Sequence, residues 1–154
     1  MTVCTFAGHR EVWDVGIQAA LDEEVEKLLE KEGQYVFYSG GMGQFDALCA
    51  AAVRRGKLRH PESDIKLVLV LPYMKQEINA DKRYFEEIYD DIIVPEELMG
   101  VHYKQAIGKR NRWMVDRADV LFSYVYREFG GAYKTLRYAE KRKNLKIVSF
   151  ASDK

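Results

Sequence analysis

Two kinds of hydrophobic pattern alternate along this chain. Short, nearly continuous apolar runs are typical of strands covered on both faces, whereas apolar residues spaced three or four apart are typical of amphipathic helices. The apolar runs predict strands over residues 2–7, 35–38, 65–71, 91–94, 119–125 and 145–150. The periodic segments predict helices from near Asp14 to Gly33, from Phe45 onward, over residues 84–89, over residues 102–118 and after Gly131. Residues 54–64 and 73–83 are the most polar stretches and are expected to be surface loops.

This alternation sets the fold class. Strands joined by helical crossovers form a parallel sheet with right-handed connections. We therefore predict an α/β protein, a Rossmann-like three-layer α/β/α sandwich with a mainly parallel central sheet, and we place the strand near Thr2 in the sheet interior. The 154 residues are enough for one continuous core, so residues 1–154 are expected to form a single domain.

A glycine-rich turn follows the second predicted strand and leads directly into a helix. It contains Ser39, Gly40, Gly41, Met42 and Gly43. A strand, a glycine-rich turn and a helix N-terminus in that order bring backbone N–H groups together and favour a bound anion. Glycine lets a phosphate approach the backbone, but the same residues also suit a tight turn that needs positive φ and binds nothing.

A second turn of the same kind lies ninety residues further on. The strand over residues 119–125 runs into Gly130 and Gly131, and the helix that follows carries Thr135. Two glycine pairs, each between a strand and a helix, suit a bipartite pocket for a phosphorylated ligand. Neither is a complete dinucleotide fingerprint, and the chain has no G-x-x-x-x-G-K-[ST] motif.

The loop after the first strand belongs to the same predicted edge, because ligands of such sheets bind beyond the carboxyl ends of the strands. Gly8, His9 and Arg10 follow that strand directly. Arg10 could hold a phosphate in a bidentate fork. The alternative is a solvated arginine and a structural histidine.

The helix over residues 102–118 contributes polar candidates. An inward stripe is expected at Tyr103, Ile107, Asn111, Met114 and Ala118. An inward amide needs hydrogen-bond partners, so Asn111 either caps a neighbouring loop or faces a ligand. Arg110 lies beside it, whereas the other cations of this helix are interpreted as solvated: Lys109, Arg112 and Arg117.

Charge and composition narrow the classes of partner. The 24 basic and 24 acidic side chains give a formal net charge of zero, which argues against a general polyanion binder, so nucleic acid is not an expected partner. Cys4 and Cys49 lie within apolar patterns and are expected to be buried thiols, and the scattered histidines lack zinc-binding spacing. We expect no metal and no cofactor. The absence of a long apolar stretch or a secretory leader pattern favours a soluble, cytoplasmic protein with no membrane partner.

Several motifs, taken in order, carry a family resemblance. The chain resembles the SLOG superfamily, which groups the LOG cytokinin-activating phosphoribohydrolases, the Smf/DprA proteins and the YpsA-like proteins, and it is most similar to the YpsA-like branch. The first motif, Thr5-Phe6-Ala7-Gly8-His9-Arg10, resembles the T-G-H-R-type turn of that branch. The others are the segment from Gly40 to Asp46, the segment from Arg110 to Asp119, and Gly130-Gly131 ahead of Thr135. The resemblance implies a nucleotide pocket and a homo-oligomer.

Compared with the LOG enzymes, the chain keeps one motif and departs from another. Arg110, Met114 and Ala118-Asp119 keep the LOG spacing, so Arg110 resembles the site arginine of those enzymes. The following motif lacks the leading proline and the third glycine, and Arg137 stands near the place of the catalytic glutamate. An arginine can neither stabilise an oxocarbenium-like ribosyl centre nor activate water.

Two functions therefore stay open. The first is the binding of a nucleotide or a nucleotide-derived, ADP-ribose-like molecule, in a regulatory or sensory role. The second is hydrolysis or transfer at the N-glycosidic bond of a nucleotide, for which the candidate carboxylates are Asp46 and Glu128. Asp46 also suits the first turn of a helix by charge alone, so its presence does not require catalysis.

Overall fold

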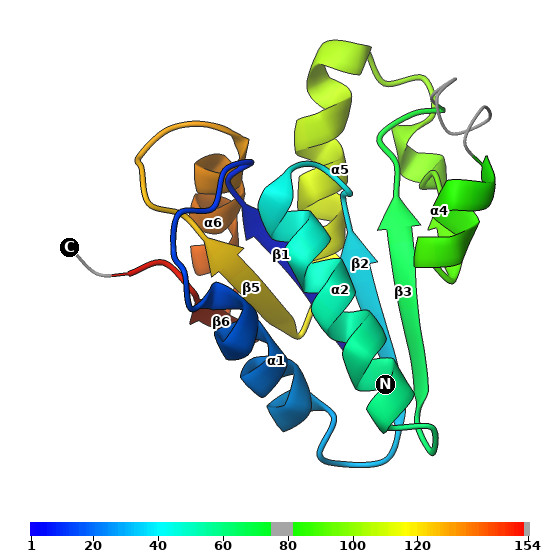
Figure 1. The fold of residues 1–154 in the computed structure, drawn as a ribbon. Coiled ribbons are helices and arrows are strands. Elements are labelled where there is room, and N and C mark those ends of the chain that lie inside the picture. Colours follow the sequence, from blue (N-terminus) through cyan, green and yellow to red (C-terminus); the bar gives the residue numbers. More distant parts are fainter. Residues whose placement is uncertain (75–81, 153–154) are drawn as a thin grey trace.

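The computed structural model describes residues 1–74 and 82–152 and shows one parallel sheet between two layers of helices (Figure 1). Its six strands have the order β4-β3-β2-β1-β5-β6, and every neighbouring pair is parallel. They are β1 (Thr2–Gly8), β2 (Gln34–Ser39), β3 (Asp64–Val70), β4 (Asp91–Ile93), β5 (Val120–Tyr124) and β6 (Lys146–Ser149). The predicted Rossmann-like sandwich is confirmed, and β1 lies in the sheet interior as expected.

Five α-helices flank the sheet in the described part of the chain. They are α1 (Ile17–Leu28), α2 (Gln44–Arg59), α4 (Lys82–Ile88), α5 (Tyr103–Arg117) and α6 (Gly131–Glu140), with a 3-10 turn at Glu96–Leu98. Helices α1 and α2 cover one face of the sheet, and α5 and α6 cover the other (Figure 1).

The core is divided between these two faces because alternate residues of each strand point to opposite sides. Phe6, Phe37 and Phe122 pack with apolar residues of α1 and α2, such as Leu21 and Phe45. On the opposite face, a smaller cluster joins the sheet to α5 and α6 through Ala7, Leu121, Val115 and Ala139. Both faces of the central strands are therefore apolar, which explains their nearly continuous apolar runs.

The order of the strands reverses between β1 and β5. From β1 the chain moves outward through β2, β3 and β4, and it then returns to the other side of β1 to form β5 and β6. The loops after β1 and β5 consequently lead to helices on opposite faces of the sheet. A crevice at the carboxyl ends of the strands follows from this topology.

Of the two predicted surface loops, the first was wrong over residues 54–59, and the second is only partly described. Residues 54–59 belong to helix α2, because Arg55 and Arg59 form ion pairs with Asp22 and Glu26 of α1. A polar stretch can thus stay helical by pairing with a neighbouring helix. The expected loop over residues 73–83 lies partly outside the described residues, and its last two residues begin α4.

The predicted inward stripe of α5 was also wrong at its first position. Tyr103 is 62 % exposed, and the buried residues of α5 are Ala106, Arg110, Met114 and Val115. A charged residue occupies a buried position, so the apolar pattern alone could not indicate this face. The prediction of two buried thiols is confirmed, since Cys4 and Cys49 are both free and buried.

Candidate functional site

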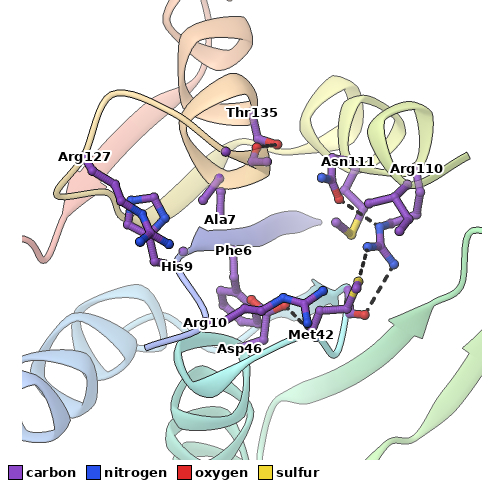
Figure 2. Close-up of a pocket in the computed structure, with 17 residues that line it drawn as sticks. Phe6, Ala7, His9, Arg10, Met42, Asp46, Arg110, Asn111, Arg127 and Thr135 are labelled. Atoms are coloured by element: carbon purple, nitrogen blue, oxygen red, sulfur yellow. Dashed lines mark hydrogen bonds between the residues drawn. The ribbon is translucent and has the colours of Figure 1, made fainter. Parts of the chain in front are cut away.

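A cavity of about 220 Å³ opens at the carboxyl edge of the sheet, where the strand order reverses (Figure 2). Four segments far apart in the sequence meet there: the end of β1, the turn after β2, helix α5, and the loop from β5 into α6. The lining residues are Phe6, Ala7, Gly8, His9, Arg10, Gly40, Met42, Asp46, Ile107, Arg110, Asn111, Met114, Arg127, Gly130, Gly131, Ala132 and Thr135.

The turn between β2 and α2 is closed by its own hydrogen bonds. The Ser39 hydroxyl oxygen accepts a hydrogen bond from the Gly41 N–H at 3.1 Å, and the Asp46 carboxylate accepts one from the Met42 N–H at 3.0 Å. One backbone N–H group of this turn, close to the start of α2, is therefore already hydrogen-bonded to a carboxylate of the protein. The α2 turn offers less room to an external anion than its glycine content suggests.

Only part of this turn faces the cavity. Gly40 and Met42 line it, whereas Ser39, Gly41 and Gly43 do not. At Gly41 the backbone φ is +64°, and a Cβ there would lie 2.6 Å from Cδ1 of Leu69 in β3. The requirement for glycine at position 41 is thus structural, as the alternative interpretation of the turn proposed.

The turn between β5 and α6 is open instead. Gly130 caps α6 without any side-chain hydrogen bond. In the described part of the chain, no acceptor takes the amide N–H groups of Gly131, Ala132 and Tyr133. Gly131 and Ala132 line the cavity, and a Cβ at Gly131 would meet no atom within 4 Å. This helix N-terminus therefore presents free donors and a positive dipole end to the cavity.

The hydroxyl of Thr135 turns back into its own helix. It donates a hydrogen bond to the Gly131 carbonyl oxygen at 2.9 Å. Its proton is therefore already used, and toward the cavity Thr135 offers lone pairs rather than a donor.

His9 is held tightly at the end of β1. Its backbone N–H donates to the Tyr124 carbonyl oxygen at 3.1 Å, and its ring meets the Tyr126 ring edge-on with centroids 4.5 Å apart. The side chain is 4 % exposed, and its buried Nε2 has no hydrogen-bond partner among the described residues. Burial first, and the nearby charge of Arg127 second, lower the pKa of His9, which keeps the imidazole neutral at pH 7.

The arginines at the mouth of the cavity differ from the expectation. Arg10 is exposed and lines the cavity, and its role as a phosphate ligand stays a prediction. Arg127, which the sequence analysis did not single out, lines it too, on the same side of the cavity as His9 (Figure 2). The neighbouring candidate carboxylate, Glu128, is exposed and lies outside the lining. Arg137 is also outside it and pairs with Glu140 of its own helix.

Arg110 is a buried cation that ties together the ends of two strands. It is 2 % exposed, and its Nη1 donates to the carbonyl oxygens of Val70 at 2.8 Å and of Gly40 at 3.3 Å. Its Nε donates to Oδ1 of Asn111 at 2.9 Å, and its Nη2 lies 3.2 Å from Sδ of Met42 (Figure 2). These contacts use four of the five N–H groups of the side chain. Arg110 consequently holds the floor of the cavity in place and keeps one N–H for a ligand.

Asn111, for which the sequence left a loop cap and a ligand contact open, lines the cavity, but one side of its amide is occupied. Its oxygen receives the hydrogen bond from Arg110, which leaves the amide NH₂ as the group available to a ligand.

Asp46 combines burial with an unusual pKa. It is 7 % exposed, and burial raises its pKa from 3.8 to about 6, against the opposing effects of the Met42 N–H and of the Arg110 charge. One carboxylate oxygen bonds to Met42, and no other hydrogen bond to this carboxylate occurs in the described part of the chain. A buried carboxyl group that titrates close to neutrality can accept a hydrogen bond from a ligand hydroxyl or exchange a proton with it.

The remaining lining residues escaped prediction for a simple reason. Phe6, Ala7, Ile107 and Met114 have apolar side chains, and the sequence placed them in the core rather than at a cavity.

The residues around the cavity include no metal centre: no group of three His, Cys, Asp or Glu residues that could hold a metal ion occurs in residues 1–74 and 82–152. Over the same residues, no helix is long and apolar enough to span a membrane.

The fold and the cavity define a Rossmann-like α/β protein with a pocket at the switch point of its sheet. Two solved structures of DNA processing protein A (DprA) resemble it. The protein from Helicobacter pylori, studied for its single-stranded DNA binding mode, has a TM-score of 0.61 and 16 % identity over 95 % of this chain. The protein from Streptococcus pneumoniae has a TM-score of 0.55 and 13 % identity over 96 % of this chain. The chain spans 64 % and 58 % of their lengths, so it accounts for less than two thirds of either, and the likeness concerns the fold alone.

One relative is found by sequence. The uncharacterised SPbeta prophage-derived protein YoqJ of Bacillus subtilis is 27 % identical over 132 residues, which cover 76 % of each protein. No protein-family model matches the chain. The resemblance to the Smf/DprA proteins is thus seen in the fold, and the closer resemblance to the YpsA-like branch stays a prediction.

Proposed function

We propose that this protein binds a nucleotide or a nucleotide-derived molecule in the cavity at the switch point, in a regulatory or sensory role, as a member of the YpsA-like branch of the SLOG superfamily. The observation that carries the proposal is the open N-terminus of α6, whose free amides at Gly131 and Ala132 line the cavity. Free amides and the positive end of a helix dipole form a ready site for a phosphate.

The two glycine turns have different parts in this proposal. The turn into α6 receives the phosphate, because its donors are free. The turn into α2 instead presents Asp46, whose carboxylate can accept hydrogen bonds from ribose hydroxyls. Arg110 and Met42 form the floor between them, and the Asn111 amide is placed to donate to the ligand.

The test is calorimetric titration with AMP, ADP, ADP-ribose and NAD. Gly131→Val should abolish binding of whichever compound binds the wild type, because its side chain would stand in the open space beside the free amides. Gly108→Val is the matched control: Gly108 also has no atom within 4 Å of a built Cβ, but it is in α5 and outside the cavity lining. Equal affinities in the wild type and Gly131→Val, or no binding of any of the four compounds, would refute the proposal.

A second candidate function is cleavage at the N-glycosidic bond, and Asp46 is the observation that favours it. Its carboxyl group is in the cavity, is shielded from water and has a pKa of about 6. Such a group can protonate a leaving base or activate water near neutral pH. Glu128 has no comparable position. Chromatography of AMP incubated with the protein decides between the two functions: free adenine that appears with the wild type and not with Asp46→Asn would establish the enzyme.

A further inference from the structure

Two polar side chains of the cavity, on the loops after β1 and β5, have no hydrogen-bond or ion-pair partner for their nitrogen atoms in the described part of the chain. Arg127 is exposed, and its guanidinium has no carboxylate within 4 Å among the described residues. It lies over aromatic rings instead, 4.9 Å from the Phe129 centroid and 5.4 Å from the Tyr126 centroid. The second is His9, whose Nε2 is buried and unpartnered. A buried ring nitrogen without a partner costs free energy that a folded protein normally avoids.

Both side chains line the same cavity as the first residues of α6. They come from the two loops that flank the reversal of strand order, after β1 and after β5. Figure 2 shows them on the same side of the cavity, and the charge of Arg127 is close enough to lower the pKa of His9. The free amides of Gly131 and Ala132 line the same cavity. One cation, one imidazole and a helix N-terminus therefore converge from separate elements without an acidic partner.

We propose that Arg127 and His9 complete a phosphoryl site at the start of α6, with Arg127 covering His9 in the free protein and turning to the phosphoryl oxygens when a ligand binds. This inference rests on the proposed function and names the residues that recognise the anionic group. The guanidinium supplies charged donors in a planar fork, and the α6 amides supply neutral ones. When Arg127 moves away, Nε2–H of His9 can donate a hydrogen bond to a phosphoryl oxygen, so this nitrogen is no longer unpaired.

The alternative roles of these residues explain less. Stacking of Arg127 on Phe129 buries little, because Phe129 is itself 63 % exposed. The contact of His9 with the Tyr126 ring uses the face or edge of the imidazole and leaves Nε2 without an acceptor or donor. If the ring at position 9 served only for packing, an apolar aromatic side chain would do so without leaving a buried nitrogen such as Nε2 unpaired.

Other charged groups around His9 were considered in the same way. Asp46, Arg110 and Arg10 also line the cavity, on its α2 side. Asp46 accepts from the Met42 amide, Arg110 donates to the Gly40 and Val70 carbonyls, and Arg10 lies against Gly43 of the α2 turn. Arg127 is therefore the cation of the cavity that lies on the loop leading into α6.

The first experiment compares two ligands that differ only in the phosphate. AMP and adenosine are titrated into the wild type, Arg127→Gln and His9→Gln. Arg127→Gln should lower the affinity for AMP by about ten-fold or more, since a charged hydrogen bond contributes about 1.5–3 kcal/mol, and should leave the affinity for adenosine unchanged. Arg137→Gln is the matched control, because Arg137 is an exposed arginine of α6 outside the cavity. An Arg127→Gln protein that binds AMP as tightly as the wild type overturns the inference and leaves the proposed function standing.

The second experiment needs no nucleotide and keeps the inference testable if none of the nucleotides binds. Inorganic phosphate is titrated to millimolar concentration while NMR follows the His9 ring nitrogens and the Gly131 and Ala132 amides. All three should shift together, and Arg127→Gln should weaken the response of His9 most. Absence of any shift at these atoms in the wild type refutes the phosphoryl site directly.

Discussion

Arg110 should contribute more to folding than to ligand binding, and Arg110→Met tests this. The substitution keeps an unbranched apolar chain but removes the guanidinium that bonds the carbonyl oxygens of Gly40 and Val70. It also removes the positive charge that faces the buried Asp46 carboxylate. Each carbonyl oxygen left without a donor costs about 1–3 kcal/mol when water cannot replace it, and the lost charge adds a smaller cost because Arg110 and Asp46 do not form an ion pair within 4 Å.

The two costs overlap, because Asp46 can respond. Its pKa is already about 6, so a proton taken up on loss of Arg110 removes the unpaired charge for little free energy near neutral pH. We therefore expect the free energy of unfolding at pH 7 to fall by about 3 kcal/mol, mostly from the two carbonyl oxygens left without a donor. Asp46→Asn combined with Arg110→Met should cost less than the sum of the two single changes, because the single changes act on one interaction.

The assay is equilibrium unfolding in urea, with the midpoint and slope fitted together. Arg112→Met is the matched control on the same helix, because Arg112 is exposed, and its loss should change stability by less than about 0.5 kcal/mol. If Arg110→Met costs less than about 1 kcal/mol, which is no more than an ordinary exposed ion pair contributes, the role assigned to Arg110 in joining β2 to β3 is incorrect.

Three further predictions follow from other parts of the fold. The pKa of Asp46 is about 6 in the folded protein against 3.8 without burial, so its contribution to stability is full below pH 3.8 and is lost as the pH rises through 6. The difference amounts to roughly 3 kcal/mol. When the free energy of unfolding is measured in urea across this pH range, its dependence on pH should be weaker in Asp46→Asn than in the wild type. Gly41→Ala should lower the melting temperature because of its positive φ and the contact with Leu69, whereas Gly131→Ala should leave it unchanged in a thermal scan. Cys4 and Cys49 are 1 % and 0 % exposed with raised pKa values owing to burial, so a thiol reagent should modify them only after urea unfolds the protein, and modification in native buffer would show that the core opens.

Much of the fold could be predicted because its strands carry long apolar runs. The run over residues 65–71 predicted β3, which the structure shows at Asp64–Val70, and the glycine turns correctly marked the starts of α2 and α6. The strand-to-helix alternation was sufficient for the parallel topology, since right-handed crossovers allow few other arrangements. The prediction of the buried face of α5 failed, because α5 buries Arg110 and an apolar pattern assigns a charged residue to the surface.

The cavity was less predictable for a related reason. A sequence shows which loop follows a strand but not which of its residues turns inward, so Glu128 was a candidate while its neighbour Arg127 was missed. Similarly, glycine content made the two turns look equivalent. Their difference depends on where hydrogen bonds are already made, by Ser39 and Asp46 at one turn and by no side chain at the other.

The assembly of the cavity from four distant segments has a practical consequence for ligand discovery. Residues from Phe6 to Thr135 contribute to it, so the cavity depends on the folding of most of the chain. A compound that occupies it therefore stabilises the folded chain as a whole, by about 2.7 kcal/mol at a concentration one hundred times its dissociation constant. An upward shift in melting temperature is thus a general readout of occupancy. A metabolite collection can be screened in this way before any reaction is known, and Gly131→Val separates compounds held in the cavity from those bound elsewhere.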